Sequence, residues 1–104
     1  MILRYSPEAL EDLKQIKDYI SENLHNPTAA NRVVSTIAKS CYNLKEYPKM
    51  GLRLSEKTGR DTDLRYIITG KYFAFYRIEK HYISVIRVLD GRTNYLQILF
   101  NSEN

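Results

Sequence analysis

The spacing of apolar residues changes between the two halves of the chain, and this change limits the fold more than any other feature. Before about residue 45, apolar residues recur every three or four positions, as on one face of an amphipathic helix. After residue 63, β-branched and aromatic residues form short runs separated by turn residues, which is typical of strands. The chain has 104 residues and no internal repeat, so a single domain is expected, with the helices packed on the sheet.

Two helices are predicted in the first half. Ser6-Pro7-Glu8 combines a capping serine, a proline and an acidic residue, which predicts a helix over 7–25. Asn26-Pro27 starts a second helix that ends before Pro48, and the short turn between the two predicts an antiparallel hairpin. The charged residues of the first helix, Asp12 among them, are expected on the surface. The expected apolar stripes are Leu10, Leu13, Ile16, Ile20 and Leu24, then Ala30, Val33, Val34, Ile37, Cys41 and Leu44.

The remaining elements are predicted to be strands. The three main runs are separated by Thr69-Gly70-Lys71 and Glu79-Lys80-His81, which suit hairpin turns. The polar segment Pro48–Asp63 is expected to be a long loop, and Leu96–Phe100 fits a strand, a short helix or a tail. The order β-α-α-β-β-β predicts an α+β fold in which the hairpin covers one face of a mostly antiparallel sheet. The expected strands are Ile2–Tyr5, a short one around Leu52–Leu54, Leu64–Ile68, Tyr72–Ile78 and Tyr82–Leu89.

Composition narrows the class of protein. The single cysteine, Cys41, lies on an apolar stripe, which favours a core residue in a reducing compartment over a disulfide or a nucleophile. No run of 18 apolar residues exists, and Arg4 and Glu8 interrupt the region where a secretion signal needs an apolar segment. A cytoplasmic location without a membrane partner is therefore expected.

Few conventional catalytic groups are present. The two histidines, His25 and His81, are far apart in the sequence, and the chain has no Gly-rich phosphate loop and no Cys or His pair at metal-binding spacing. Neither a metal nor another cofactor is therefore expected. The net charge of +4 is concentrated in residues 49–104, where ten Lys and Arg face six Asp and Glu. This excess indicates either an anionic partner or a solvated basic surface.

Arginines interrupt the predicted strands among many tyrosines. The planar guanidinium group suits phosphates and tyrosine rings can stack on bases, so this composition is compatible with RNA binding. Arginines that cover the sheet edges and tyrosines that fill a core fit equally well. In Tyr82–Leu89, Arg87 shares a face with Ile83, Val85 and Leu89, but the opposite face is also partly apolar, so alternation does not select a direction for the arginine.

An ordered series of short motifs resembles the RelE/ParE superfamily of bacterial type II toxins over nearly the whole chain. The resemblance implies a single toxin domain over 1–104, neutralised by a cognate antitoxin that wraps over its surface. The motifs are Ser6-Pro7-Glu8-Ala9, Asp12-Leu13, Ile16, Tyr19-Ile20, Leu44, Tyr47-Pro48, Gly51, Leu64-Arg65-Tyr66-Ile67-Ile68, Phe75-Tyr76-Arg77-Ile78 and Ile86-Arg87-Val88-Leu89-Asp90-Gly91-Arg92.

Two activities occur in this superfamily. One branch cleaves mRNA in the ribosomal A site, which requires acid–base groups and cations around the attacked phosphate. The resemblance implies Arg65, Arg87, Arg92 and Tyr95 as its catalytic groups here. However, Asp90 stands where many relatives have a histidine, and a free tyrosine titrates near 10. The residues expected to bind RNA or another target in either branch are Lys49, Arg53, Arg60 and Arg77.

The other branch poisons DNA gyrase and needs no catalytic group. The helical hairpin that begins at Ser6-Pro7, the turn from Tyr47-Pro48 to Gly51 and the stretch Arg87–Arg92 look more like this ParE branch, which is favoured on the sequence. A plasmid-stabilisation type of toxin that arrests growth is therefore expected. The alternatives are a ribosome-dependent mRNA endoribonuclease and a basic interaction module without toxicity.

Overall fold

The computed structural model describes residues 1–101 and contains one five-stranded sheet with the order β1-β5-β4-β3-β2. β1 runs parallel to β5, and the other neighbouring pairs are antiparallel. The α+β class and the order of the main elements are confirmed; residues 102–104 of the expected 1–104 domain lie outside the described residues. The strands are β1 (Ile2–Tyr5), β2 (Leu52–Arg53), β3 (Arg65–Thr69), β4 (Tyr72–Ile78) and β5 (Tyr82–Asp90).

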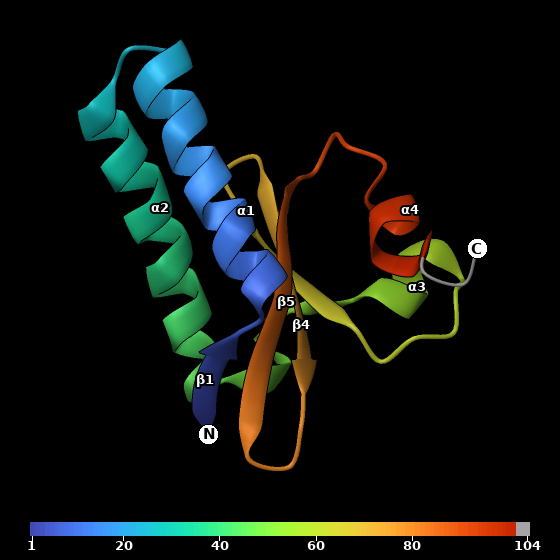
Figure 1. Ribbon diagram of the computed structural model, residues 1–104. Helices are drawn as coiled ribbons and strands as arrows, with labels where there is room; N and C mark the ends of the chain where they lie inside the picture. The colour runs from blue at the N-terminus through green and yellow to red at the C-terminus, as the bar shows by residue number, and fades with distance from the viewer. Residues whose placement is uncertain (102–104) are drawn as a thin grey trace.

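The first half of the chain forms the predicted hairpin of α1 (Pro7–Asp18) and α2 (Pro27–Tyr42), which stands against one side of the sheet (Figure 1). Ser6 Oγ accepts a hydrogen bond from the Ala9 amide at 3.0 Å, and Asn26 Oδ1 accepts one from the Ala29 amide at 3.1 Å. Both predicted caps are therefore formed, each followed by a proline at the first helical position.

The first helix differs from the expected continuous helix over 7–25. Its α-helical part ends at Asp18, and a π-helical segment, η1 (Tyr19–Asn23), follows it. Leu10 and Leu24 are each 54% exposed, so their expected burial is wrong, whereas Asp12 is buried. The wider π-helical turn breaks the three-to-four spacing, which moves Leu24 off the buried face.

The two faces of the sheet carry separate cores. The larger core lies under the hairpin and includes Ile37, Cys41 and Tyr76. The smaller core, on the opposite face, is covered by α3 (Leu54–Thr58) and α4 (Tyr95–Phe100), which lie together on the other side of the sheet in Figure 1. Cys41 is fully buried, which confirms its predicted place in the core, and this burial raises the pKa of its thiol to about 11.

The segment between α2 and β3 is more structured than the expected loop. Two single 3₁₀ turns, η2 (Asn43–Lys45) and η3 (Pro48–Met50), precede β2. Leu54 begins α3 and is fully buried, so its predicted place in a strand is wrong. At the end of the chain, Leu96–Phe100 is helical and three of its apolar residues pack against the smaller core: Leu96, Leu99 and Phe100.

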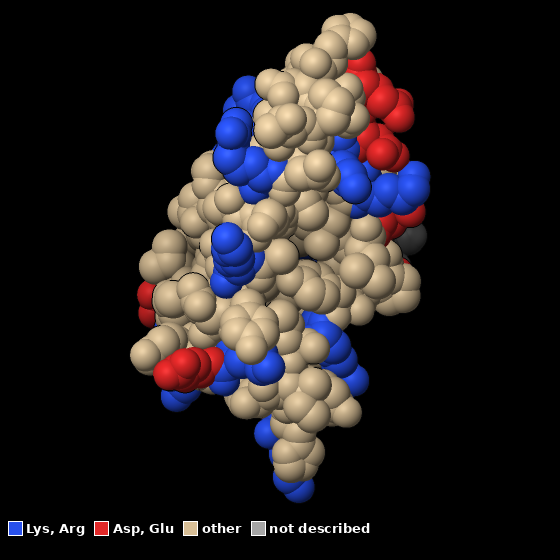
Figure 2. Space-filling model, turned by 90° about the vertical axis from the view of Figure 1, so that its left-hand side faces the viewer, with Lys and Arg blue, Asp and Glu red and all other residues tan. Residues whose placement is uncertain are grey.

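The face on which α2 lies is shown in Figure 2. Blue Lys and Arg side chains are distributed over this face, and red Asp and Glu side chains gather along the upper right margin, with a further red group at the lower left. Within the described part of the chain, no helix has both the length and the apolar character needed to cross a membrane.

The phenol group of Tyr76 fastens η3 to the sheet. The hydroxyl group of this fully buried residue donates to the Pro48 carbonyl at 2.6 Å and accepts from the Gly51 amide at 3.0 Å. A Cβ atom at Gly51 would lie 2.5 Å from the Tyr76 oxygen, so only glycine allows this approach. Burial also raises the pKa of Tyr76.

We expect Tyr76→Phe to lower the free energy of unfolding by about 1–3 kcal/mol, because it leaves a buried amide and carbonyl without their partner. Urea denaturation measures this loss, and amide hydrogen exchange at Gly51 should accelerate. Tyr47→Phe is the control, since Tyr47 is 60% exposed. Equal stability of the two variants would contradict the anchoring role of Tyr76.

Candidate functional site

Arg87, predicted as a catalytic residue, is bound to a buried carboxylate that the sequence placed on the surface. Its Nε and Nη2 atoms donate to the two oxygens of Asp12, each at 2.8 Å. The Val88 amide donates to the same carboxylate at 2.9 Å. Asp12 therefore has both charge compensation and backbone hydrogen bonding, the two conditions under which an ion is stable inside a protein.

The position of Asp12 follows from the end of β1. β1 pairs with β5 only as far as Tyr5 opposite Val85, which leaves the rest of that edge of β5 without a strand. Ser6 continues the contact, because its amide donates to Val85 and its hydroxyl group to the Ile86 carbonyl. Asp12 then binds the Val88 amide, so α1 replaces β1 along this edge.

Arg65 is bound to the backbone of the η3 segment. Its Nη1 atom donates to the Gly51 carbonyl at 2.9 Å and approaches the Lys49 carbonyl at 3.5 Å. Arg53 lies directly opposite Arg65 in the β2–β3 pairing and forms an ion pair with Glu56 at 3.3 Å. The structure therefore brings three of the predicted residues together at this edge of the sheet: Lys49, Arg53 and Arg65.

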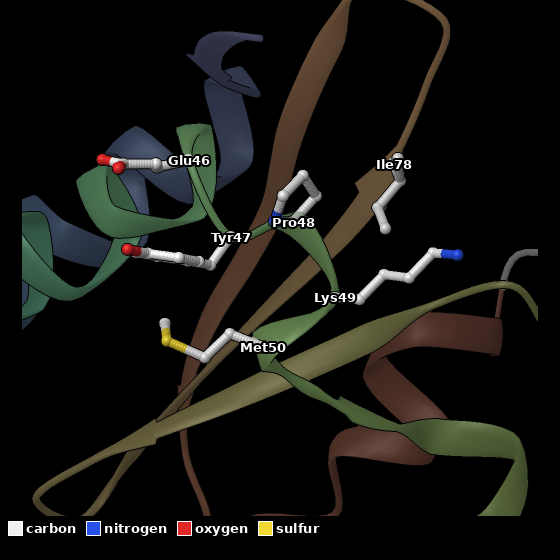
Figure 3. Close-up of a pocket in the computed structure, with 6 residues that line it drawn as sticks. All are labelled: Glu46, Tyr47, Pro48, Lys49, Met50 and Ile78. Carbon is white, nitrogen blue, oxygen red and sulfur yellow. The ribbon is translucent and has the colours of Figure 1, made fainter.

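An apolar hollow of about 730 Å³ lies beside this cluster. Figure 3 shows Tyr47 and Lys49 pointing in opposite directions from the turn, with Pro48 between them and Ile78 facing it from β4. Tyr47 is 60% exposed and Met50 49% exposed. The residues that line the hollow are Glu46, Tyr47, Pro48, Lys49, Met50 and Ile78, a set that suits binding better than chemistry.

Arg92 and Tyr95 are also engaged within the chain. Arg92 binds Asp90 through its Nε and Nη2 atoms at 3.1 and 2.8 Å. Hydrogen bonds from Arg92 lower the pKa of Asp90 to about 2. The bond from the Arg92 side chain is the largest cause, and the bond from the Arg92 backbone amide adds to it. The Tyr95 ring packs against Phe73 and Phe75, with centroid distances of 5.6 and 5.2 Å. Asp90 is thus a carboxylate at neutral pH whose charge the neighbouring arginine balances.

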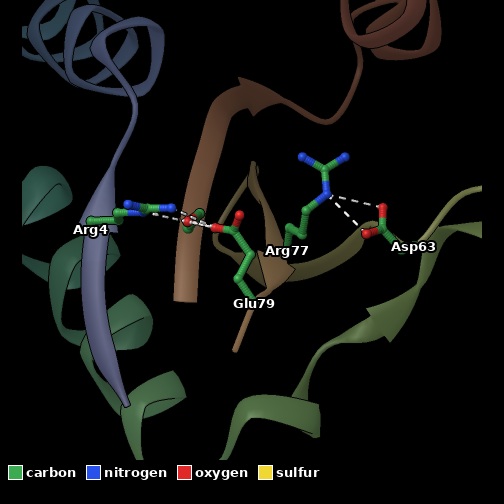
Figure 4. Close-up of polar contacts among 5 residues, drawn as sticks. Arg4, Asp63, Arg77 and Glu79 are labelled. Carbon is green, nitrogen blue, oxygen red and sulfur yellow. Dashed lines mark hydrogen bonds and ion pairs between the residues drawn. The ribbon is translucent and has the colours of Figure 1, made fainter. Parts of the chain in front are cut away.

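Arg77 lies in a polar row on the face of the sheet opposite the hairpin (Figure 4). Its Nε atom donates to both oxygens of Asp63, at 3.0 and 3.1 Å, and its two terminal nitrogens point away from that carboxylate. On β1, Arg4 binds Glu79 at 2.9 Å and Ser84 at 2.8 Å. Hydrogen bonds from Ser84 and Arg4 lower the pKa of Glu79, so this row alternates positive and negative charge.

The four residues implied as catalytic do not converge on one point. Arg65 lies opposite Tyr76 on β4, whereas Asp90, which holds Arg92, lies opposite Tyr72 at the other end of that strand. Tyr72 and Tyr76 are four positions apart on β4, which corresponds to about 13 Å along the strand. The guanidinium carbon of Arg60 lies 4.2 Å from the centroid of the Phe100 ring. Phe100 belongs to the C-terminal helix α4, so Arg60 is placed against that helix. No group of three possible metal ligands occurs among residues 1–101.

We expect Asp12→Ala to lower the free energy of unfolding by about 3 kcal/mol, because it leaves Arg87 and the Val88 amide without their shared partner. Urea denaturation of wild type and variant measures the loss. Asp18→Ala is the matched control: it removes an exposed ion pair with Lys14 and should cost less than about 1 kcal/mol. If both variants lose the same stability, Asp12 is not the anchor of α1.

We expect Arg92→Gln to raise the pKa of Asp90 towards the ordinary value of about 3.9. The folded-state pKa lies below the unfolded one, so the stability from Asp90 is complete above about pH 4 and lost as the pH falls through about 2. A carboxyl-carbon NMR titration measures the shift, with Arg53→Gln as control. An unchanged Asp90 titration in Arg92→Gln would disprove the assignment.

Comparison with known proteins identifies the family. The family model for the ParE toxin of the type II toxin–antitoxin system parDE matches residues 3–95. A solved chain described as the chromosomal ParDE toxin–antitoxin system from P. aeruginosa has the same fold, with a TM-score of 0.73 and 21% sequence identity over 86% of this chain and 95% of that one. No curated protein is similar enough to count as a match. The chain belongs to the ParE family of type II toxins.

Proposed function

We propose that this chain arrests bacterial growth by poisoning DNA gyrase and that a cognate antitoxin neutralises it. Poisoning means that the toxin holds gyrase on DNA that the enzyme has cut. It requires a surface that binds the target, and no acid–base group. The membership in the ParE family supports the toxin part of this proposal, and the state of the arginines supports the choice of target.

The observation that carries the choice is that the groups needed by a nuclease are bound to internal partners. Arg87 is bound to Asp12, Arg65 to the Gly51 carbonyl and Arg92 to Asp90. A cation that stabilises a phosphate transition state has to be free to face it. Asp90, the residue at the position where the resemblance implies a histidine, is ion-paired with Arg92, and its lowered pKa makes it a poor proton donor at neutral pH.

Features suited to binding are present on the same molecule. The apolar hollow beside Tyr47 and Met50 has Lys49 at its margin. The terminal nitrogens of Arg77 point away from Asp63 and are placed to meet an anionic group. A hollow of this kind fits apolar side chains of a partner protein. The cations Lys49 and Arg77 would fix the orientation of that partner.

The antitoxin part of the proposal rests on the ParDE system named for the similar structure. We expect expression of this chain alone to stop growth and co-expression with the product of the neighbouring gene to restore it. Normal growth of cells that make abundant folded protein would contradict toxicity and would favour a basic interaction module.

The sharpest test separates the two targets. We expect purified protein with gyrase and plasmid to accumulate linear DNA after detergent and protease treatment, because the cut ends stay held by gyrase until it is denatured. Reactions without gyrase are the control. In cell-free translation, mRNA should remain intact, both for wild type and for Arg92→Gln/Tyr95→Phe. Ribosome-dependent cuts that this double variant abolishes would overturn the gyrase proposal and establish the nuclease alternative.

A further inference from the structure

The outward face of α2 carries cations without acidic partners. Arg32 and Lys39 are exposed, and neither forms a salt bridge with any described residue. Lys45, in η2, lies over the Tyr42 ring at 4.6 Å. The sequence between Glu22 and Glu46 contains no acidic residue at all. The positive charge of this face is therefore not balanced from within its own segment.

The arginines of the sheet contrast with this arrangement. The sequence suggested that the basic second half meets an anionic partner, but several of its arginines are ion-paired inside the chain. Their positive charge is largely cancelled at the surface, whereas that of α2 is not. The paired arginines are Arg53 with Glu56, Arg77 with Asp63, Arg87 with Asp12 and Arg92 with Asp90.

The cations of α2 lie in one line. Arg32, Thr36, Lys39 and Asn43 are spaced by four, three and four residues, so they share one stripe of the helix. We call these four residues together with Lys45 the α2 stripe. A rise of 1.5 Å per residue places Arg32 and Lys39 about 10 Å apart and makes the whole stripe about 20 Å long.

We propose that the α2 stripe binds the phosphate backbone of duplex DNA without sequence preference. One DNA strand presents a phosphate about every 3.4 Å along the axis, so a stripe of about 20 Å spans roughly six of them. Asn43 supplies a neutral hydrogen-bonding group between Lys39 and Lys45, and no carboxylate lies between Arg32 and Lys45 in the sequence.

The chemistry of the stripe favours duplex DNA over other anionic partners. A protein partner would need apolar side chains at the centre of the contact, but Tyr42 is the one large apolar residue of α2 that is strongly exposed among the described residues. Single-stranded nucleic acid is bound by stacking on several successive aromatic rings, and Tyr42 is the one aromatic residue of α2. A row of cations without further aromatic rings suits a regular phosphate backbone.

The test is direct binding of a fluorescent DNA duplex of about 20 base pairs, measured by anisotropy without gyrase. With three cations engaged, the affinity of wild type should fall about 40-fold as salt rises from about 50 to 200 mM. Arg32→Gln/Lys39→Gln/Lys45→Gln should lower the slope of log affinity against log salt by about 2.7. The control, Lys17→Gln/Lys57→Gln/Lys80→Gln, removes the same charge from exposed sites elsewhere and should change it by less than about 1.

A charge-retaining variant separates charge from folding: Arg32→Lys/Lys39→Arg/Lys45→Arg should bind as wild type does. The proposal is overturned if wild type does not bind the duplex at low salt, or if both glutamine variants lose the same affinity. It is also overturned if polyglutamate displaces the duplex at equal charge concentration, since the stripe would then prefer an acidic protein. Because gyrase is absent from the assay, these outcomes leave the gyrase proposal untouched.

Discussion

The carboxylate of Asp12 fills the gap that β1 leaves along the edge of β5, and the arrangement of the helices on the sheet depends on it. β1 ends opposite Val85, so the Val88 amide has no strand to pair with. Asp12 accepts that hydrogen bond and the two from Arg87. Because α1 must pass close to this edge for the contact to form, the same residue sets where the hairpin lies over the larger core.

Much of the fold could be predicted from local sequence patterns. The caps at Ser6 and Asn26, the hairpin and β4 follow from periodicity and turn chemistry. What could not be predicted depends on contacts between distant residues. A charged side chain on a helix is ordinarily exposed, and the partner that makes Asp12 an exception is 75 residues away. A register shift at Phe75/Tyr76 likewise breaks the alternation along β5, so counting faces from Ile83 to Arg87 fails.

The candidate site was predictable in its residue types and not in its geometry. The sequence singles out the arginines correctly as unusual, because three of them interrupt apolar strands. Their partners come from other elements: Asp12 from α1, the Gly51 carbonyl from the segment before β2, and Asp63 from the segment before β3. Ion pairing of this kind turns residues that look target-facing into structural ones. Positive charge that is not ion-paired with any described residue then lies on α2, at Arg32 and Lys39. Two cations on a helix are a weaker sequence signal than arginines that interrupt apolar strands.

The parallel pairing of β1 with β5 also has a consequence for the order in which the molecule can be completed during synthesis. Ile2 lies opposite Tyr82 and Tyr5 opposite Val85, so β1 has no partner until β5 has been made. The hairpin can form early, but its docking at Asp12 waits for Arg87 and Val88. A chain that stops before β5 therefore lacks the partner of β1 and the contacts of Asp12 with Arg87 and Val88.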